Sequence, residues 1–427
     1  MIRFGKKIPA QALQFVLLIS TLVFLLLGSF ILLTYTQSFF RVQSTESRSY
    51  VAMATHRLVD FIRTYNLSQT RDTIRTDEGR LQTNRIATYH GAWSTVFSEV
   101  ISNGTRVRRA ALIGTKTEKS PNLYLSNYSS PLVVVGRTRL EGELFVPELG
   151  IQAGTIGGRY YEGQNLHHGE IRKSTDQLPK LNPQWLSYTE KLLAKDYMVE
   201  AYMIRMDTES KNSFYGPPRI VYEPGPIVLG QQEISGNVHL YSDTKITVHP
   251  EALLSDVLLI APEIHLLGNV QGRMHLIASR HIMIDEGCHL SYPSSVVLLS
   301  KEKPVSLPSK SLRKDTAIIP VEIKEKTTIE GSVVYIPLIS PDEQSFSEIH
   351  VKTYPGTTLK GELYCQGNLD FQGTVMGSLY TDHLVAGQEG SLYINHIYDG
   401  HILKNSIPQY AGLPIENRSN TIAKWMY

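Results

Sequence analysis

Two stretches of this 427-residue chain follow one pattern: IHLLGNVQGRM at residues 264–274 and LDFQGTVMGSL at residues 369–379. Every second position in both is apolar or glycine, which is the period of a β-strand with one buried face. A shorter frame, apolar-x-Gly-x-apolar, recurs around Gly142, Gly236, Gly268, Gly331, Gly361 and Gly373. Similar segments follow one another at steps of about 17–22 residues, a length that suits one coil of a solenoid. The pattern predicts an interrupted β-solenoid (β-helix), with an antiparallel β-sandwich as the alternative.

A long apolar segment indicates where the protein sits. From Phe15 to Leu33 the sequence reads FVLLISTLVFLLLGSFILL, and no charged residue lies between Lys7 and Arg41. As a helix, the segment spans roughly 28 Å, close to the thickness of the hydrocarbon core of a bilayer. It is longer than the apolar region of a signal peptide, and no small-residue cleavage pattern follows it. We therefore expect an uncleaved signal anchor with the lipid bilayer as its partner.

The basic residues around this segment predict its orientation. Arg3, Lys6 and Lys7 precede it closely, whereas Arg41 and Arg48 follow at a greater distance. Basic residues are enriched on the cytoplasmic side of a membrane span. Since no later segment reaches about 18 apolar residues, we expect a single-pass protein. Its N-terminus lies in the cytoplasm and its bulk is extracytoplasmic, in the periplasm if the source is bacterial.

The chain is expected to be mainly β and to divide into four parts. Residues 1–40 form the cytoplasmic tip and the transmembrane helix, and residues 41–130 form a juxtamembrane helix with a small α/β stalk. Residues 131–402 form the solenoid, and residues 403–427 form a C-terminal cap or tail. Two segments break the strand pattern and are interpreted as insertions into the solenoid, near residues 165–218 and 301–326.

Local signals within these parts predict further elements. Apolar residues at helical spacing over residues 44–65 indicate the juxtamembrane helix. The polar stretch at residues 66–89 is interpreted as a loop or weak structure. Asn182 followed by Pro183 ahead of an apolar run is typical of a helix start, because asparagine caps the helix and proline fits its first position.

Charge and cysteine content exclude several classes of protein. The 42 Lys and Arg residues against 40 Asp and Glu residues leave a formal charge of +2, so the composition does not indicate a nucleic-acid partner. Two cysteines cannot form a disulfide framework. The alternation places Cys288 and Cys365 inside the solenoid, where small thiols fit without a function.

Candidate functional side chains do not combine into a recognisable site. Strand alternation places His239, His265 and His275 on the outer face, as solvated residues, and sends the adjacent His167 and His168 to opposite sides. The carboxylates near aligned strands are Asp285, Glu286, Asp370 and Asp382, and His396 to His401 is interpreted as a closing turn. Aromatic residues that could form a carbohydrate platform are Tyr160, Tyr161, Tyr364, Tyr380, Tyr393 and Tyr398. We therefore assign no catalytic, cofactor-binding or metal-binding residue.

The glycine-punctuated segments at residues 236–287 and 331–390 resemble the bactofilins, which are polymer-forming bacterial scaffold proteins with a short right-handed β-helix. The resemblance covers about a third of the chain and implies a scaffold capable of self-association. Bactofilins are smaller and lack the anchor, the stalk and the insertions expected here. The irregular tail that ends in Trp425 is expected to block one end of the solenoid.

The N-terminus resembles a pilin or pseudopilin, because a short basic stretch leads into a long apolar helix with an amphipathic continuation. That family has glycine before its cleavage point and glutamate at the fifth mature position. Here Lys6, Lys7 and Pro9 lead into Gln11, and the processing motif is absent.

These observations favour a non-catalytic, membrane-anchored scaffold or docking protein of the cell envelope, with an envelope protein or a polysaccharide as partner. One alternative is a polysaccharide-active β-helix enzyme, whose acid and base would come from carboxylates on adjacent coils. The other is a pseudopilin-like component of a secretion or pilus assembly machine.

Overall fold

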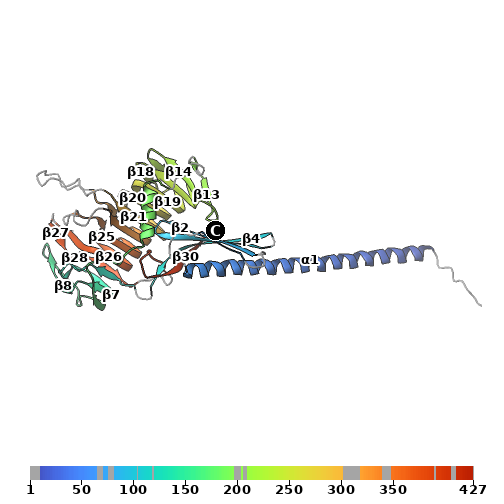
Figure 1. The fold of residues 1–427 in the computed structure, drawn as a ribbon, viewed down its shortest axis with the longest axis horizontal. Coiled ribbons are helices and arrows are strands. Elements are labelled where there is room, and N and C mark those ends of the chain that lie inside the picture. Colours follow the sequence, from blue (N-terminus) through green and yellow to red (C-terminus); the bar gives the residue numbers. More distant parts are fainter. Residues whose placement is uncertain are drawn as a thin grey trace, which may run out of the picture.

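The computed structural model describes residues 10–64, 71–75, 81–102, 104–117, 120–196, 203–204, 209–301, 318–338, 348–388, 391–404 and 410–426. Its described part is mainly β, as predicted, with one long apolar helix at the N-terminus. The helix, an antiparallel sheet and a larger body of mostly parallel strands follow one another across the molecule (Figure 1).

Helix α1 (Ala10–Thr64) is continuous over 55 residues. The apolar segment and the helix predicted at residues 44–65 are both helical and belong to this one element. Residues 34–43 contain neither proline nor glycine, so nothing interrupts the helix between the two segments. Among the described residues, α1 is the one helix long and apolar enough to cross a membrane, and its apolar window is entirely unburied. Figure 1 shows this end of α1 extending away from the β structure.

The antiparallel sheet has the strand order β1-β2-β3-β4-β30. Its strands are β1 (Arg71–Arg75), β2 (Leu81–His90), β3 (Trp93–Ser102), β4 (Thr105–Lys116) and β30 (Ser419–Met426). Strand β2 lies in the polar stretch that was predicted to be a loop. That prediction was wrong for residues 81–89, because all of β2 pairs in register with the more apolar β3. Polar side chains such as Thr83 therefore become buried in the sheet.

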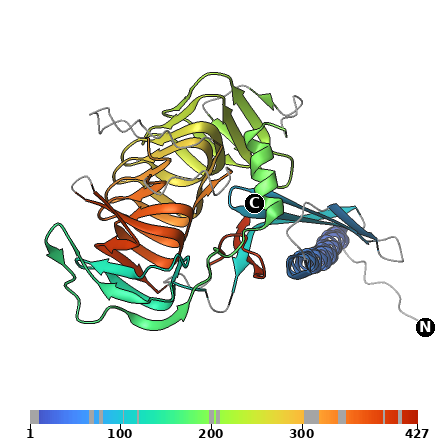
Figure 2. The same ribbon diagram turned by 60° about the vertical axis from the view of Figure 1, so that its left-hand side comes forward.

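Alternate residues of β4 pack on opposite faces of this sheet. Ala111 and Ile113 contact a cluster that includes Leu58 of α1, while Ala110 and Leu112 face the parallel body. Around residues 110–113 of β4, both faces of the sheet are therefore covered, one by the C-terminal turns of α1 and the other by the parallel body. Figure 2 shows the sheet between these two parts.

The strands between β4 and β30 make up the rest of the fold, here called the parallel body. They are β5 (Leu123–Leu125), β6 (Leu132–Val135), β7 (Arg139–Val146), β8 (Ile151–Ala153), β9 (Thr155–Ile156), β10 (Arg159–Tyr160), β11 (His168–Lys173), β12 (Met203–Ile204), β13 (Glu209–Asn212), β14 (Arg219–Glu223), β15 (Ile227–Leu229), β16 (Glu233–Gly236), β17 (Val238–Ser242), β18 (Lys245–Val248), β19 (Leu253–Leu266), β20 (Gln271–Ile284), β21 (His289–Ser300), β22 (Val321–Ile323), β23 (Thr328–Pro337), β24 (Val351–Thr353), β25 (Thr358–Phe371), β26 (Gly373–Gln388), β27 (Ser391–Ile394), β28 (His396–Tyr398) and β29 (Gly400–Leu403). Most of them form one closed hydrogen-bonded sheet. Its parallel pairings exclude the antiparallel sandwich for this part of the chain.

Columns of buried side chains run across this sheet. Leu240 pairs with Leu259, and Leu259 pairs with Leu276, so the chain returns to the same column after 17 to 19 residues. The same column continues through Val296, Val333, Leu363 and Leu379. Ile264 and Leu369, which begin the two repeated stretches, also share one column, through Ile282, Val321 and Val351. The two stretches therefore begin at equivalent positions of the closed sheet, but they end two positions out of register, because Leu379 lies in the column of Leu276 rather than in that of Met274.

The order of the strands in space differs from their order in sequence. β26 pairs with the early strand β5, β5 pairs with β7, and β7 pairs with β11. The chain thus builds one end of the body first, crosses to the other end, and returns layer by layer (Figure 2). The crossing segment carries helix α2 (Pro183–Leu193), whose N-cap Asn182 accepts hydrogen bonds from the backbone of Gln184 and Trp185. The helix start predicted at this point is confirmed.

The division of the chain into four parts stays a prediction. Residues 165–218 include β11, α2 and β13, and most of the segment at 301–326 lies outside the described residues. The tail leads into β30, which pairs with β4. Its role as a cap stays a prediction.

Three glycines lie in register on neighbouring strands of the parallel body. Gly331 pairs with Gly361, and Gly361 pairs with Gly377. All three have φ values between +143° and +153°, a region that side chains rarely allow. A Cβ atom on Gly361 would lie 1.9 Å from the carbonyl oxygen of Gly331. The strands can approach one another at this bend only because no side chain is present.

We predict that Gly361→Ala lowers the free energy of unfolding by about 2–4 kcal/mol, because the new methyl group meets backbone in a strained conformation. Thermal unfolding of the full chain in detergent micelles would measure the loss. Gly225→Ala is the matched control, since a Cβ atom there meets nothing within 4 Å. Equal melting temperatures for the two variants would contradict the requirement for glycine.

Candidate functional site

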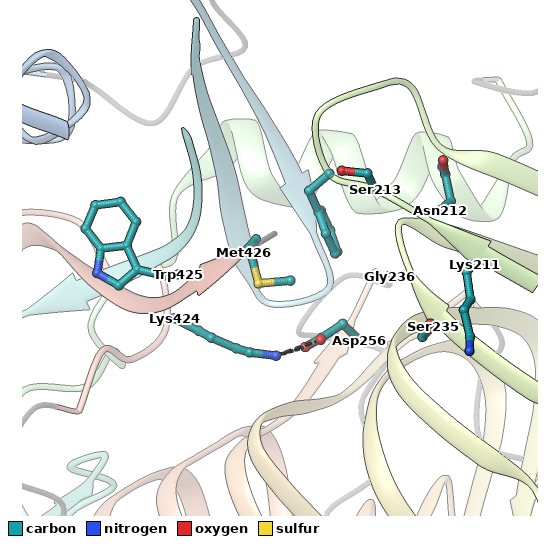
Figure 3. Close-up of a pocket in the computed structure, with 10 residues that line it drawn as sticks. Lys211, Asn212, Ser213, Ser235, Gly236, Asp256, Lys424, Trp425 and Met426 are labelled. Carbon is teal, nitrogen blue, oxygen red and sulfur yellow. Dashed lines mark hydrogen bonds and ion pairs between the residues drawn. The ribbon is translucent and has the colours of Figure 1, made fainter. Parts of the chain in front are cut away.

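A cleft of about 390 Å³ lies where the antiparallel sheet meets the parallel body, and it is called the junction cleft (Figure 3). It is formed by β13, β16 and β30 and by the bulge within β19. The lining residues are Lys211, Asn212, Ser213, Phe214, Ser235, Gly236, Asp256, Lys424, Trp425 and Met426.

Asp256 is the central charged group of the junction cleft. It is 7% exposed and sits at an irregularity of β19 with φ of +62°. Its two carboxylate oxygens accept hydrogen bonds from Arg273 (2.5 and 3.1 Å) and from the Lys424 ammonium (2.8 and 2.6 Å). Burial opposes ionisation, but these two cations outweigh it and hold the pKa of Asp256 below its usual value.

Lys424 reaches Asp256 because β30 is irregular. The pairing with β4 shifts between Ile422 and Lys424, so one extra residue is accommodated there. Ile422 and Trp425 then pack towards α1, while Met426 packs towards the parallel body. A bulge of this kind re-aims the following side chains, and here it directs Lys424 into the junction cleft.

Three buried histidines lie next to the cleft. The ring of His90 is centred 4.7 Å from that of His275 and 5.6 Å from that of His239. His90 Nε2 hydrogen-bonds to the carbonyl oxygen of Asp256 at 2.8 Å, and His275 Nδ1 to the Ser295 hydroxyl at 3.0 Å. The Nε2 atoms of His239 and His275 are buried without a hydrogen-bond partner among the described residues.

The prediction that His239 and His275 are solvated was wrong. Their side chains do point out of the parallel body, but the turn between β2 and β3, at His90 and Gly91, covers them. Both are therefore at most 5% exposed. His265, the third member of that prediction, is only partly buried and hydrogen-bonds to Asp285 at 2.8 Å.

The β2–β3 turn is held against the parallel body by close contacts. A Cβ atom on Gly91, whose φ is +63°, would lie 2.5 Å from the Ser295 hydroxyl. Helix α2 holds the same turn from another side, because the Trp185 indole donates to the Gly91 carbonyl at 2.9 Å. The Tyr188 hydroxyl donates to the Tyr89 carbonyl at 3.2 Å. The β2–β3 turn, α2 and the parallel body, which are distant in sequence, therefore pack closely together at this junction.

The other carboxylates considered from the sequence lie apart from the junction cleft. Asp370 is buried beside Lys352, with 3.1 Å between its carboxylate and the ammonium, and burial raises its pKa. Asp382 hydrogen-bonds to the Ser126 hydroxyl at 3.0 Å. Asp399 accepts a hydrogen bond from the backbone of Arg137, within the turn expected at residues 396–401.

The two cysteines are buried, as the alternation predicted, and both are free thiols. Burial raises the pKa of Cys288 to about 11, so this thiol is protonated at neutral pH. Of the tyrosines considered as a carbohydrate platform, Tyr364 and Tyr380 are buried and Tyr160 is 69% exposed. Of the side chains that line the junction cleft, the sequence singled out that of Trp425, and only as part of a cap. The cleft itself could not be predicted, because β13, β16 and β30 are brought together only by the tertiary fold.

The charged groups of the junction cleft form a structural ion-pair network. Its one carboxylate is engaged by two cations, which leaves it a poor general base. Among the described residues, no group of three or more His, Cys, Asp or Glu side chains is placed to hold a metal ion.

No protein-family model matches the chain, and no curated protein is similar to it in sequence. Among solved structures, the crystal structure of the competence-associated pilin ComZ from Thermus thermophilus is a distant match. The two chains share 9% sequence identity over 84% of this chain and 85% of the other, with a TM-score of 0.23. At this TM-score the likeness does not indicate what this chain does.

We predict that acid weakens the junction. Burial lowers the pKa of His90 to about 4 and those of His239 and His275 well below the ordinary value. The unfolded chain takes up these protons near pH 6.5, so stability falls as the pH drops from 6.5 towards 4, by up to about 1.4 kcal/mol per pH unit and histidine. The charges of Asp256 and Lys424 persist over this range, so they do not cancel the effect.

Thermal unfolding of the full chain in detergent between pH 7.5 and 4.5 would measure this dependence. His239→Leu removes one titrating group and should flatten the profile, whereas the exposed His168→Leu should leave it unchanged. Burial also lowers the pKa values of His350 and His383 to about 4, so these two groups add to the acid loss in every variant. Asp382 acts in the opposite direction, because burial raises its pKa to about 6. A profile that is equally steep in both variants would contradict the prediction.

Proposed function

We propose that this chain is a non-catalytic, membrane-anchored protein of the cell envelope whose parallel body serves as a scaffold or docking surface. The proposal rests on the contrast between the two ends of α1. Its apolar first half is exposed, with Phe24 at 76%, while Leu58 near its other end is fully buried against the antiparallel sheet. A helix of this kind joins a bilayer directly to a folded body.

The same proposal includes the orientation and the architecture. The cluster of Arg3, Lys6 and Lys7 supports a cytoplasmic N-terminus and an extracytoplasmic body. The first two steps of the column, of 19 and 17 residues, support the description of the parallel body as a β-solenoid. Later steps range from 16 to 37 residues, the longest where the segment near 301–326 is inserted. On this view each coil buries its apolar side chains only against its neighbours.

The proposal does not include bactofilin-like polymerisation. Strand β11 is the last in a series of paired strands that runs from β26 through β5 and β7. All six of its residues are exposed, including Glu170, Arg172 and Lys173. Charged edge strands resist edge-to-edge pairing.

A second candidate is a pilin-like component of an assembly or secretion machine. It is favoured by the way one continuous helix begins in a free apolar half and ends packed on an antiparallel sheet. In this arrangement the free half of α1 could pack against the helices of neighbouring subunits within the membrane.

We predict that charges in the apolar half of α1 abolish membrane attachment. Arginine near the centre of a span costs about 3 kcal/mol, so Leu22→Arg combined with Leu26→Arg should shift the protein to the soluble fraction. Val42→Arg is the control, because this exposed residue lies in the same helix beyond the apolar segment. Flotation of membranes in a density gradient would measure attachment. Retention of the double variant on membranes would contradict the anchor.

Photocrosslinking in intact membranes would separate the two candidates. A crosslinker at Val228, which is 53% exposed on the parallel body, should capture an envelope protein if the body is a docking surface. A crosslinker at Phe24 should capture the helix of another subunit if the chain is pilin-like. No capture at Val228, together with turnover of glycans by the full chain, would overturn the docking proposal.

A further inference from the structure

A second and larger cavity, of about 700 Å³, lies on the side of the parallel body and is called the side cavity. One wall is the segment that leads into α2, and the opposite wall is formed by β23, β25 and β26. Leu178, Leu181 and Ile336 supply apolar surface, and the Tyr364 hydroxyl donates a hydrogen bond to the Pro179 carbonyl between the two walls. Its volume is in the range of small-molecule sites.

Tyr128 provides an aromatic platform at this cavity. Its ring stacks on His383, with ring centres 4.2 Å apart and planes 25° from parallel. Burial lowers the pKa of His383 to about 4, so the supporting imidazole is neutral at pH 7. Tyr128 remains 45% exposed. A half-exposed ring that is held flat from behind suits the apolar face of a sugar ring.

Polar groups converge on the same platform. Asp176 and Asp382 line the cavity together with Tyr128. Burial, followed by the charges of Asp382 and Asp176, raises the pKa of the Tyr128 hydroxyl. Asp382 is oriented by its hydrogen bond from Ser126. The Gln366 amide also lines the cavity. These groups offer hydrogen-bond acceptors and a donor to ligand hydroxyls.

The charge of the side cavity indicates which class of ligand it favours. Three carboxyl groups, those of Asp176, Asp382 and Glu416, line it together with one ammonium group, that of Lys180. A ligand that carries positive charge is therefore favoured over a neutral or acidic one.

We propose that the side cavity binds an oligosaccharide that contains amino sugars. One ring stacks on Tyr128, its hydroxyl groups bond to Asp382 and Gln366, and its ammonium groups lie against the acidic lining. The inference deepens the docking function proposed above, since it names a polysaccharide as the partner. A lysine-rich peptide would satisfy the charge but makes no use of the platform that Tyr128 and His383 form.

The test is calorimetric titration of the full chain in detergent micelles with the glucosamine trimer, the N-acetylglucosamine trimer and tetralysine. We expect the glucosamine trimer to bind most tightly. Tyr128→Ala should weaken that binding at least tenfold, whereas Tyr128→Phe should retain it, because the ring is preserved. Asp382→Asn should weaken the glucosamine trimer more than the acetylated trimer. Tyr160→Ala, at an exposed tyrosine outside the side cavity, is the control and should change nothing.

The proposal is overturned if neither trimer binds the unmodified chain at millimolar concentration, whether or not tetralysine binds. It is also overturned if Tyr128→Ala binds as tightly as the unmodified chain while its thermal unfolding is unchanged. Membrane flotation and capture at Val228 do not involve the side cavity. Those results can therefore support the docking function even if the trimers fail to bind.

Discussion

The alternation of side chains along β4 joins the two halves of the molecule. Ala111 and Ile113 pack towards α1, and Ala110 and Leu112 pack towards the parallel body. An antiparallel sheet usually has one face in water, but here both faces are covered. Helix α1 and the parallel body are therefore held by the same few strands, and the charged junction around Asp256 forms at the edge of that contact.

The elements that could be predicted from the sequence are those with strong local signals. The 19-residue apolar segment, the asparagine cap of α2, the strand alternation and the inward orientation of Cys288 and Cys365 all follow from neighbouring residues. β2 was missed because its polar composition hides an alternation that matters only once β3 pairs with it. The layer order was missed because the pairing of β26 with β5 joins residues more than 250 positions apart.

The candidate sites depend on contacts of the same long range. Strand parity correctly directed His239 and His275 away from the interior of the parallel body, but no local pattern indicates that the β2–β3 turn covers them. Asp382 was singled out as a carboxylate near an aligned strand. Its neighbour Tyr128 was not, because that tyrosine lies in a short polar loop whose position is set by β5 and β26.

The parallel body is an insertion between two neighbouring strands of the antiparallel sheet. It leaves the sheet after Lys116 and re-enters it at Ser419, and these two residues are paired. A tight turn in place of the body would therefore convert β4 and β30 into an ordinary hairpin and leave a complete helix-on-sheet module. The parallel body is therefore joined to the helix and sheet through one pair of adjacent chain positions, although it packs against a whole face of that sheet.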